Sequence, residues 1–140
     1  MSLKSAAALT AVALLAAGTA HAEIVHFSAT LNGASEVPPN SSAGKGEVSA
    51  ELETNEHTLT YRASYSDLSG PATAAHFHGP AAPGANAPPA VMIKNPAKIA
   101  GAVLLTPQEA DDLLAGKWYF NVHTQANPGG EIRGQLARLN

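Results

Sequence analysis

Apolar and polar residues alternate along most of the chain, which is the pattern of β-strands with one buried face. Residues 24–31 place Val25, Phe27, Ala29 and Leu31 on one side. Residues 46–68 alternate on both sides of the sequence TNEH and predict a β-hairpin that turns there. Residues 117–124 and 130–139 flank the sequence QANPGG and predict a second hairpin.

One segment carries a helix signal instead. In residues 106–117, Thr106 is a suitable N-cap, Pro107 suits the first helical position, Glu109 completes a capping box and Gly116 ends the helix. Short strands with turns and one brief helix predict an all-β domain, an antiparallel β-sandwich or small barrel. No internal repeat and no linker divides the chain, so a single domain is expected.

The core is expected to form from the apolar faces of these strands. Its predicted members are Val25, Phe27, Val48, Leu52, Leu59, Tyr61, Phe77, Trp118, Phe120, Val122, Ile132 and Leu136. On the strand 117–124, Tyr119, Asn121 and His123 then share the opposite face.

The first residues fit an export signal better than a membrane anchor. Lys4 precedes the apolar run Ala6–Ala17, which is too short to span a bilayer, and Ala20-His21-Ala22 resembles a cleavage site. We therefore expect residues 1–22 to be a signal peptide and residues 23–140 the mature domain, periplasmic or secreted, without a membrane segment. Loss of Lys4 changes the formal charge from −3 to −4.

This composition excludes several functions. A mildly acidic domain lacks the basic patch needed to bind nucleic acid. The chain has no cysteine, which excludes disulfides, thiolate metal sites and a cysteine nucleophile. Neither a G-x-S-x-G motif nor a phosphate-binding glycine loop is present, and no pair of carboxylates suggests acid–base catalysis. We expect no enzymatic activity.

Two histidines stand one residue apart in the sequence AAHFHGP, Ala74–Pro80. On a strand, His76 and His78 would leave the same face while Phe77 enters the core. Imidazole is a common ligand of copper and zinc, and His123 could join if its strand lies nearby. His26 is a possible fourth ligand. The alternative is that these histidines are polar residues on a solvated strand face.

Other candidate residues carry weaker signals. His57 falls in the expected turn and should be exposed, and Met92 falls in an apolar strand, AVMIK, where core packing is expected. Glu36 and Glu131 lie in or beside loops, and Glu131 could form a weak surface pair with Arg133. Proton competition should weaken histidine-bound metal as the pH falls through about 6.5.

Three blocks of the chain resemble the CHRD domain, which is named from chordin and also occurs as a stand-alone module in bacterial exported proteins. They are LNGASEVPP, AAHFHGPAAPGANAPPAV and LLAGKWYFNVHTQANPGGEIRGQL. The resemblance implies an immunoglobulin-like antiparallel β-sandwich of Greek-key type and, from chordin, a role in extracellular binding. The H-x-H pair is also similar to the copper ligands of copper–zinc superoxide dismutases, although the zinc loop and the disulfide cysteines are missing here.

Two classes of function remain open. In the first, an exported protein binds copper, with zinc second, through His76, His78 and His123, for buffering or for delivery to a protein partner. In the second, the domain is a non-catalytic adhesion or protein-binding module with structural histidines. A dismutase-like redox enzyme is a weaker third alternative.

Overall fold

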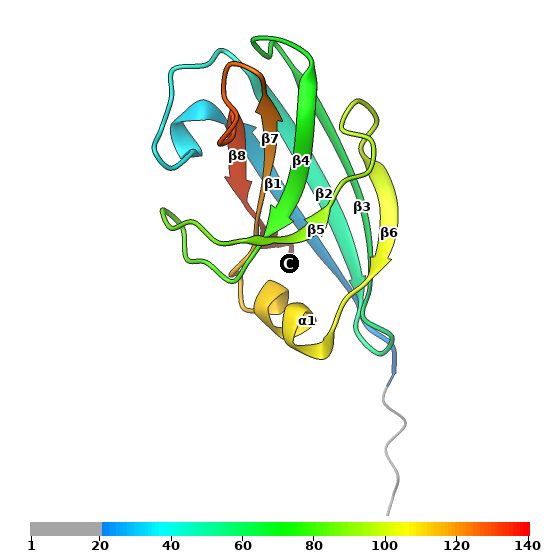
Figure 1. The fold of residues 1–140 in the computed structure, drawn as a ribbon. Helices are drawn as coiled ribbons and strands as arrows, with labels where there is room; N and C mark the ends of the chain where they lie inside the picture. The colour runs from blue at the N-terminus through cyan, green and yellow to red at the C-terminus, as the bar shows by residue number, and fades with distance from the viewer. Residues whose placement is uncertain (1–20) are drawn as a thin grey trace, which may run out of the picture.

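The structure is a computed structural model that describes residues 21–140, so residues 1–20 of the expected signal peptide lie outside the described residues. The described chain is mostly β (Figure 1). Its elements are β1 (Ile24–Asn32), η1 (Gly33–Ser35), β2 (Lys45–Glu53), β3 (Thr58–Ser66), β4 (Ala72–His78), β5 (Pro89–Met92), β6 (Ala100–Leu104), α1 (Pro107–Leu114), β7 (Tyr119–Thr124), β8 (Ile132–Gln135) and β9 (Ala137–Arg138). No helix among the described residues is long and apolar enough to cross a membrane.

The strands form one antiparallel sheet in the order β5-β4-β7-β8-β1-β2-β3-β6, with β9 paired to β1. The sheet curls until it nearly closes into a barrel, with α1 at one end (Figure 1). Tyr61 on β3 and Phe77 on β4 meet across the interior with ring centroids 5.3 Å apart, although their strands are not neighbours. The prediction of an all-β fold with one short helix is confirmed.

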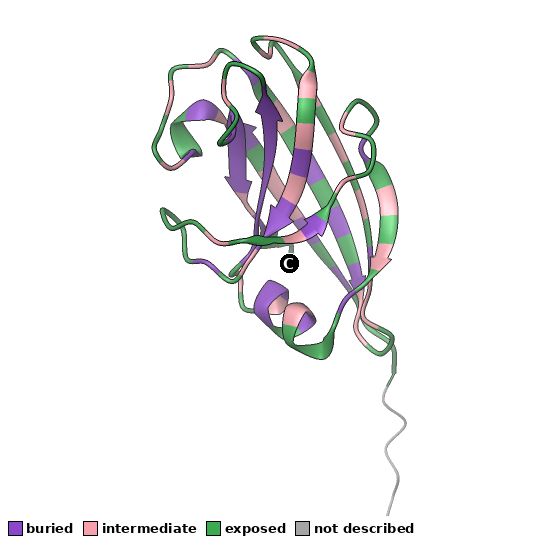
Figure 2. Cartoon of the chain, viewed as in Figure 1, coloured by how far each residue is buried: buried purple, intermediate pink, exposed green. Residues whose placement is uncertain are grey.

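The core lies between the facing parts of this curled sheet. Buried and exposed residues alternate along β1 and β2, as Figure 2 shows, because one side of each strand faces the interior. Every predicted core residue is buried except Tyr61, which is partly buried against the core. In β7 both faces are buried, because loops and side chains also cover the outer side of this strand.

The predicted helix and hairpins are confirmed, and one strand was missed. Thr106 and Glu109 form the capping box, and Gly116 follows the helix with a φ of 74°. The missed strand is β6, which pairs with β3. Its sequence AGAVL consists of small or apolar residues without a clear alternation, so it carries little periodic signal.

The expected surface pair of Glu131 with Arg133 is wrong. Glu131 is fully buried, and its carboxylate accepts hydrogen bonds from Ser42 Oγ (2.6 Å) and from Ser69 Oγ and N (2.6 and 2.8 Å). Thr124 Oγ1 and Asn127 Nδ2 also donate to it. These donors hold the pKa of Glu131 at about 2 against the cost of burial. The carboxylate thus ties two loops to the β7–β8 hairpin.

Replacing Glu131 with glutamine should therefore destabilise the domain by about 2 kcal/mol, because an amide accepts fewer of these hydrogen bonds and loses the charge that strengthens them. Urea unfolding at pH 7 measures this loss. The difference should shrink as the pH falls from about 4.5 towards 2, where the wild-type carboxylate becomes protonated in both states. Equal unfolding midpoints at pH 7 would contradict this role for Glu131.

Candidate metal centre

Strand β4 presents both histidines of the HFH sequence on its outer face, as the alternation predicts. Phe77 between them is fully buried, with its ring centroid 4.7 Å from that of Phe120. The His76 and His78 ring centroids lie 5.3 Å apart on the other side of the strand. The core contact of Phe77 fixes the strand that carries the two imidazoles.

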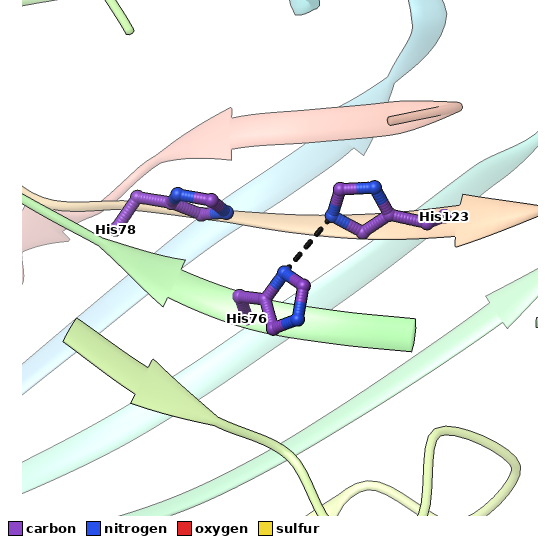
Figure 3. A group of neighbouring side chains, drawn as sticks. All are labelled: His76, His78 and His123. Carbon is purple, nitrogen blue, oxygen red and sulfur yellow. Dashed lines mark hydrogen bonds between the residues drawn. The ribbon is translucent and has the colours of Figure 1, made fainter. Parts of the chain in front are cut away.

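Strand β7 brings His123 to the same place. β7 pairs with β4 so that Asn121 lies opposite His76 and Tyr119 opposite His78. His123 Nε2 is 3.0 Å from His76 Nδ1, as the dashed line in Figure 3 shows. One ring nitrogen from each of the three histidines lies within 4.8 Å of the others. The predicted meeting of His76, His78 and His123 is therefore present.

Backbone carbonyls orient two of the rings. His78 Nδ1 lies 2.9 Å from the oxygen of Ala87, and His123 Nδ1 lies 2.9 Å from the oxygen of Pro128. Because a carbonyl only accepts hydrogen bonds, each Nδ1 must carry a proton. A neutral ring of this tautomer has its lone pair on Nε2, which in both residues faces the cluster. This is the usual arrangement of metal-binding histidines, whose second nitrogen donates to the protein.

Asn121 places a third acceptor among these nitrogens. Its Oδ1 lies 2.9 Å from both His78 Nε2 and His123 Nε2. When the rings are neutral, His78 Nε2, His123 Nε2 and Asn121 Oδ1 all present lone pairs. A proton on His76 Nδ1 can form a hydrogen bond to His123 Nε2 but not to the other two atoms. His78 Nε2 and Asn121 Oδ1 are then left facing each other. A bound cation relieves this convergence of lone pairs.

Burial keeps two of the histidines neutral. It lowers the pKa of His76 to about 4, with a further lowering from the positive charges that His123 and His78 would carry. Burial also lowers the pKa of His78, despite opposing hydrogen bonds to Ala87 and Asn121. The expectation that protons compete with metal near pH 6.5 is therefore revised for His76, because this ring stays neutral to a much lower pH.

An NMR titration of the metal-free protein should accordingly show the His76 ring titrating near pH 4. Unfolded His76 binds a proton near pH 6.5, so this residue makes the protein less stable as the pH falls from 6.5 to 4. A His76 midpoint near 6.5 would contradict the desolvated environment described here.

An aromatic and cationic stack supports the cluster from the side. The His78 ring stacks on Tyr119 with centroids 4.6 Å apart, and the Arg133 guanidinium lies 3.4 Å from the centre of the Tyr119 ring. Arg133 also donates to Asn86 Oδ1 (2.9 Å) and to the oxygen of Ala85. The loop that follows His78 is thereby held in the position from which the Ala87 oxygen accepts the hydrogen bond from His78 Nδ1.

Glu36 lies behind Asn121. Its side chain is buried, and a Cβ added to Gly130 would lie 2.3 Å from its Oε1 and 2.7 Å from Asn121 Nδ2. Gly130 also has a φ of 128°, a backbone conformation that favours glycine. Both the backbone and the lack of space therefore require glycine at this position. Burial raises the pKa of Glu36 to about 7, although the Arg133 charge and hydrogen bonds from Asn121 and Val37 oppose this.

A family model for the CHRD domain matches residues 27–136, which include the three histidines, Asn121 and Glu36. The chain belongs to the CHRD domain family. No curated protein and no solved structure matches it significantly.

Other predicted site residues of this CHRD domain lie elsewhere. His26 is half exposed on β1 and pairs with Glu51 at 3.4 Å, so the group that could hold a metal does not include it. His57 lies in the predicted turn, where it is half-buried rather than exposed. The expected core packing of Met92 is wrong, since 67% of its surface is exposed. Met92 alternates with Val91, which takes the inward position of the short strand.

The polar residues around the histidines were not predicted from the sequence. Asn121 was placed on the same face as His123, and this shared face was the available signal for its role. Glu36 gave no signal beyond its position in a loop. Arg133 was assigned to a surface pair, although β8 buries it against Tyr119.

Proposed function

We propose that this CHRD domain is an exported metal-binding protein whose ion is copper, with zinc as the second choice. His76, His78 and His123 are the proposed ligands, and the proposed role is buffering or delivery of the ion. The observation that carries this proposal is the convergence of three ring nitrogens within 4.8 Å, two of them oriented by backbone carbonyls.

The donor set favours copper. All three donors are imidazoles, and a given nitrogen site generally binds Cu(II) more tightly than Zn(II). Copper would fit a protein that leaves the cytoplasm, as the signal-peptide-like residues 1–22 suggest. His76 is the half-buried member of the cluster, so the proposed ion would enter from its side.

Two other functions stay open as alternatives. A non-catalytic module that binds a protein or surface polymer would use the same fold with structural histidines. A dismutase-like enzyme is the weaker alternative, and three protein ligands would leave the open coordination position that such chemistry requires. We propose metal binding without catalysis and expect no superoxide turnover.

We also propose that the domain is an immunoglobulin-like sandwich of Greek-key type. The support is the strand order, in which the connections β3–β4 and β6–β7 join strands that are not neighbours, while β4 pairs with β7 and β3 with β6. We propose that the mature protein is periplasmic or secreted, with the metal ion and a delivery or extracellular protein as its partners.

Elemental analysis of protein exported by its own signal tests the proposed function. We expect about one copper per chain after growth with copper, and loss of this copper in the double variant His76→Ala, His78→Ala. The double variant His26→Ala, His57→Ala is the control and should retain copper. A metal content that is the same in both double variants would contradict the proposal.

A further inference from the structure

The inference concerns Glu36 and rests on the proposed function of the histidine cluster. Glu36 is 5% exposed, and its Oε1 is buried without any hydrogen-bond partner. Arg133 is also buried and acts on Glu36 by its charge, but its guanidinium donates to Asn86 and Ala85 instead. A buried carboxyl group with an unpartnered oxygen is costly, which calls for a role other than stability.

Asn121 connects Glu36 to the histidines. Its Oδ1 faces the Nε2 atoms of His78 and His123 at 2.9 Å. Its amide nitrogen lies on the side of Glu36, because a Cβ added to Gly130 would clash with both Asn121 Nδ2 and Glu36 Oε1. A carboxylate attracts the amide nitrogen and repels the amide oxygen, so the ionised form of Glu36 selects one of the two orientations of the amide.

The two orientations have opposite effects on metal binding. With Oδ1 towards the rings, the Nε2 lone pairs have no donor from Asn121 and stay available to a cation. With Nδ2 towards the rings, the amide would donate to those lone pairs and stabilise the empty site. Holding the first orientation thus raises the affinity for a cation.

We propose that Glu36 is the positioning residue of the three-histidine site: it holds the Asn121 amide with Oδ1 towards the ring nitrogens, and its carboxylate balances the charge of the bound divalent cation. Residues that orient metal ligands from behind commonly contribute 10–100-fold to affinity, about the effect expected here. Glutamine at position 36 keeps the shape, removes the charge and can donate to Asn121, which permits the other orientation.

The test is a chelator-competition titration of Cu(II) into the mature protein and the variant Glu36→Gln, with thermal unfolding of the metal-free proteins measured in parallel. We expect the copper affinity to fall by about 10–100-fold. The melting temperature should stay unchanged or rise, because a buried carboxyl with an unpartnered oxygen has been neutralised. Glu47→Gln, at an exposed position on β2, is the matched control and should change neither value.

A second variant tests whether Glu36 acts through Asn121. In an Asn121→Ala background the further change Glu36→Gln should lower the affinity much less than in the wild type, because the amide to be oriented is gone. An undiminished affinity of the single variant Glu36→Gln would overturn the inference, as would a melting temperature that falls along with the affinity. Failure of the wild-type protein to bind Cu(II) would instead overturn the proposed function.

Discussion

Replacing Phe120 with alanine is expected to lower the free energy of unfolding by about 3–5 kcal/mol. Phe120 is fully buried on β7, and its ring packs against Phe77 on β4 at 4.7 Å between centroids. The substitution removes the apolar contacts of a whole ring and leaves a cavity where β4 and β7 meet. A single domain has roughly 5–15 kcal/mol of stability in total, so this loss is a large share.

Urea unfolding of the metal-free protein measures the effect of Phe120→Ala. Phe120→Leu serves as the control, since it retains most of the buried volume and should cost clearly less. Because Phe120 and Phe77 fix the two strands that carry the histidines, Phe120→Ala should also weaken copper binding at temperatures where it remains folded. An unchanged unfolding midpoint would mean that the inward and outward faces of β7 have been assigned in reverse.

Replacing His123 with alanine is expected to lower the affinity for Cu(II) by at least about 100-fold, beyond the usual effect of residues that only orient ligands. The substitution removes one of the three converging ring nitrogens and the ring whose tautomer is fixed by Pro128. Two imidazoles on β4 would remain, which is too few for a tight site. Competition with a chelator of known affinity measures the change.

The control for His123→Ala is His57→Ala, which removes a histidine from the turn between β2 and β3. This variant should bind Cu(II) as the wild type does. The same affinity for His123→Ala and wild type would make His123 an ordinary polar residue. The site would then shrink to the pair His76 and His78.

The strands and the facing of their side chains could be read from the sequence, because alternation has a period that burial preserves. This reasoning placed Phe77 in the core and put His76 and His78 on one outer face, and the structure confirms both. It also placed His123 on the outer face of its own strand. The register between β4 and β7 could not be read in this way, since it depends on pairing between segments about 45 residues apart.

The surroundings of the histidines were harder to predict for the same reason. Glu131 looked like a surface residue because its five hydrogen-bond donors come from segments on both sides of β4 in the sequence. Glu36 lies on a loop far from Asn121 in the sequence, and only the curled sheet brings the two together. Met92 was assigned to the core from its apolar neighbours, although on a four-residue strand a single position decides the facing.

Electron paramagnetic resonance of Cu(II) bound to the mature protein, with ¹⁵N-labelled histidine, tests the central claim most directly. The account predicts a tetragonal, nitrogen-rich spectrum with couplings from three imidazoles and without the features of thiolate ligation, because the chain has no cysteine. One set of couplings should disappear in His123→Ala and none in His26→Ala. A spectrum whose nitrogen couplings are the same in the wild type and in His123→Ala would contradict it.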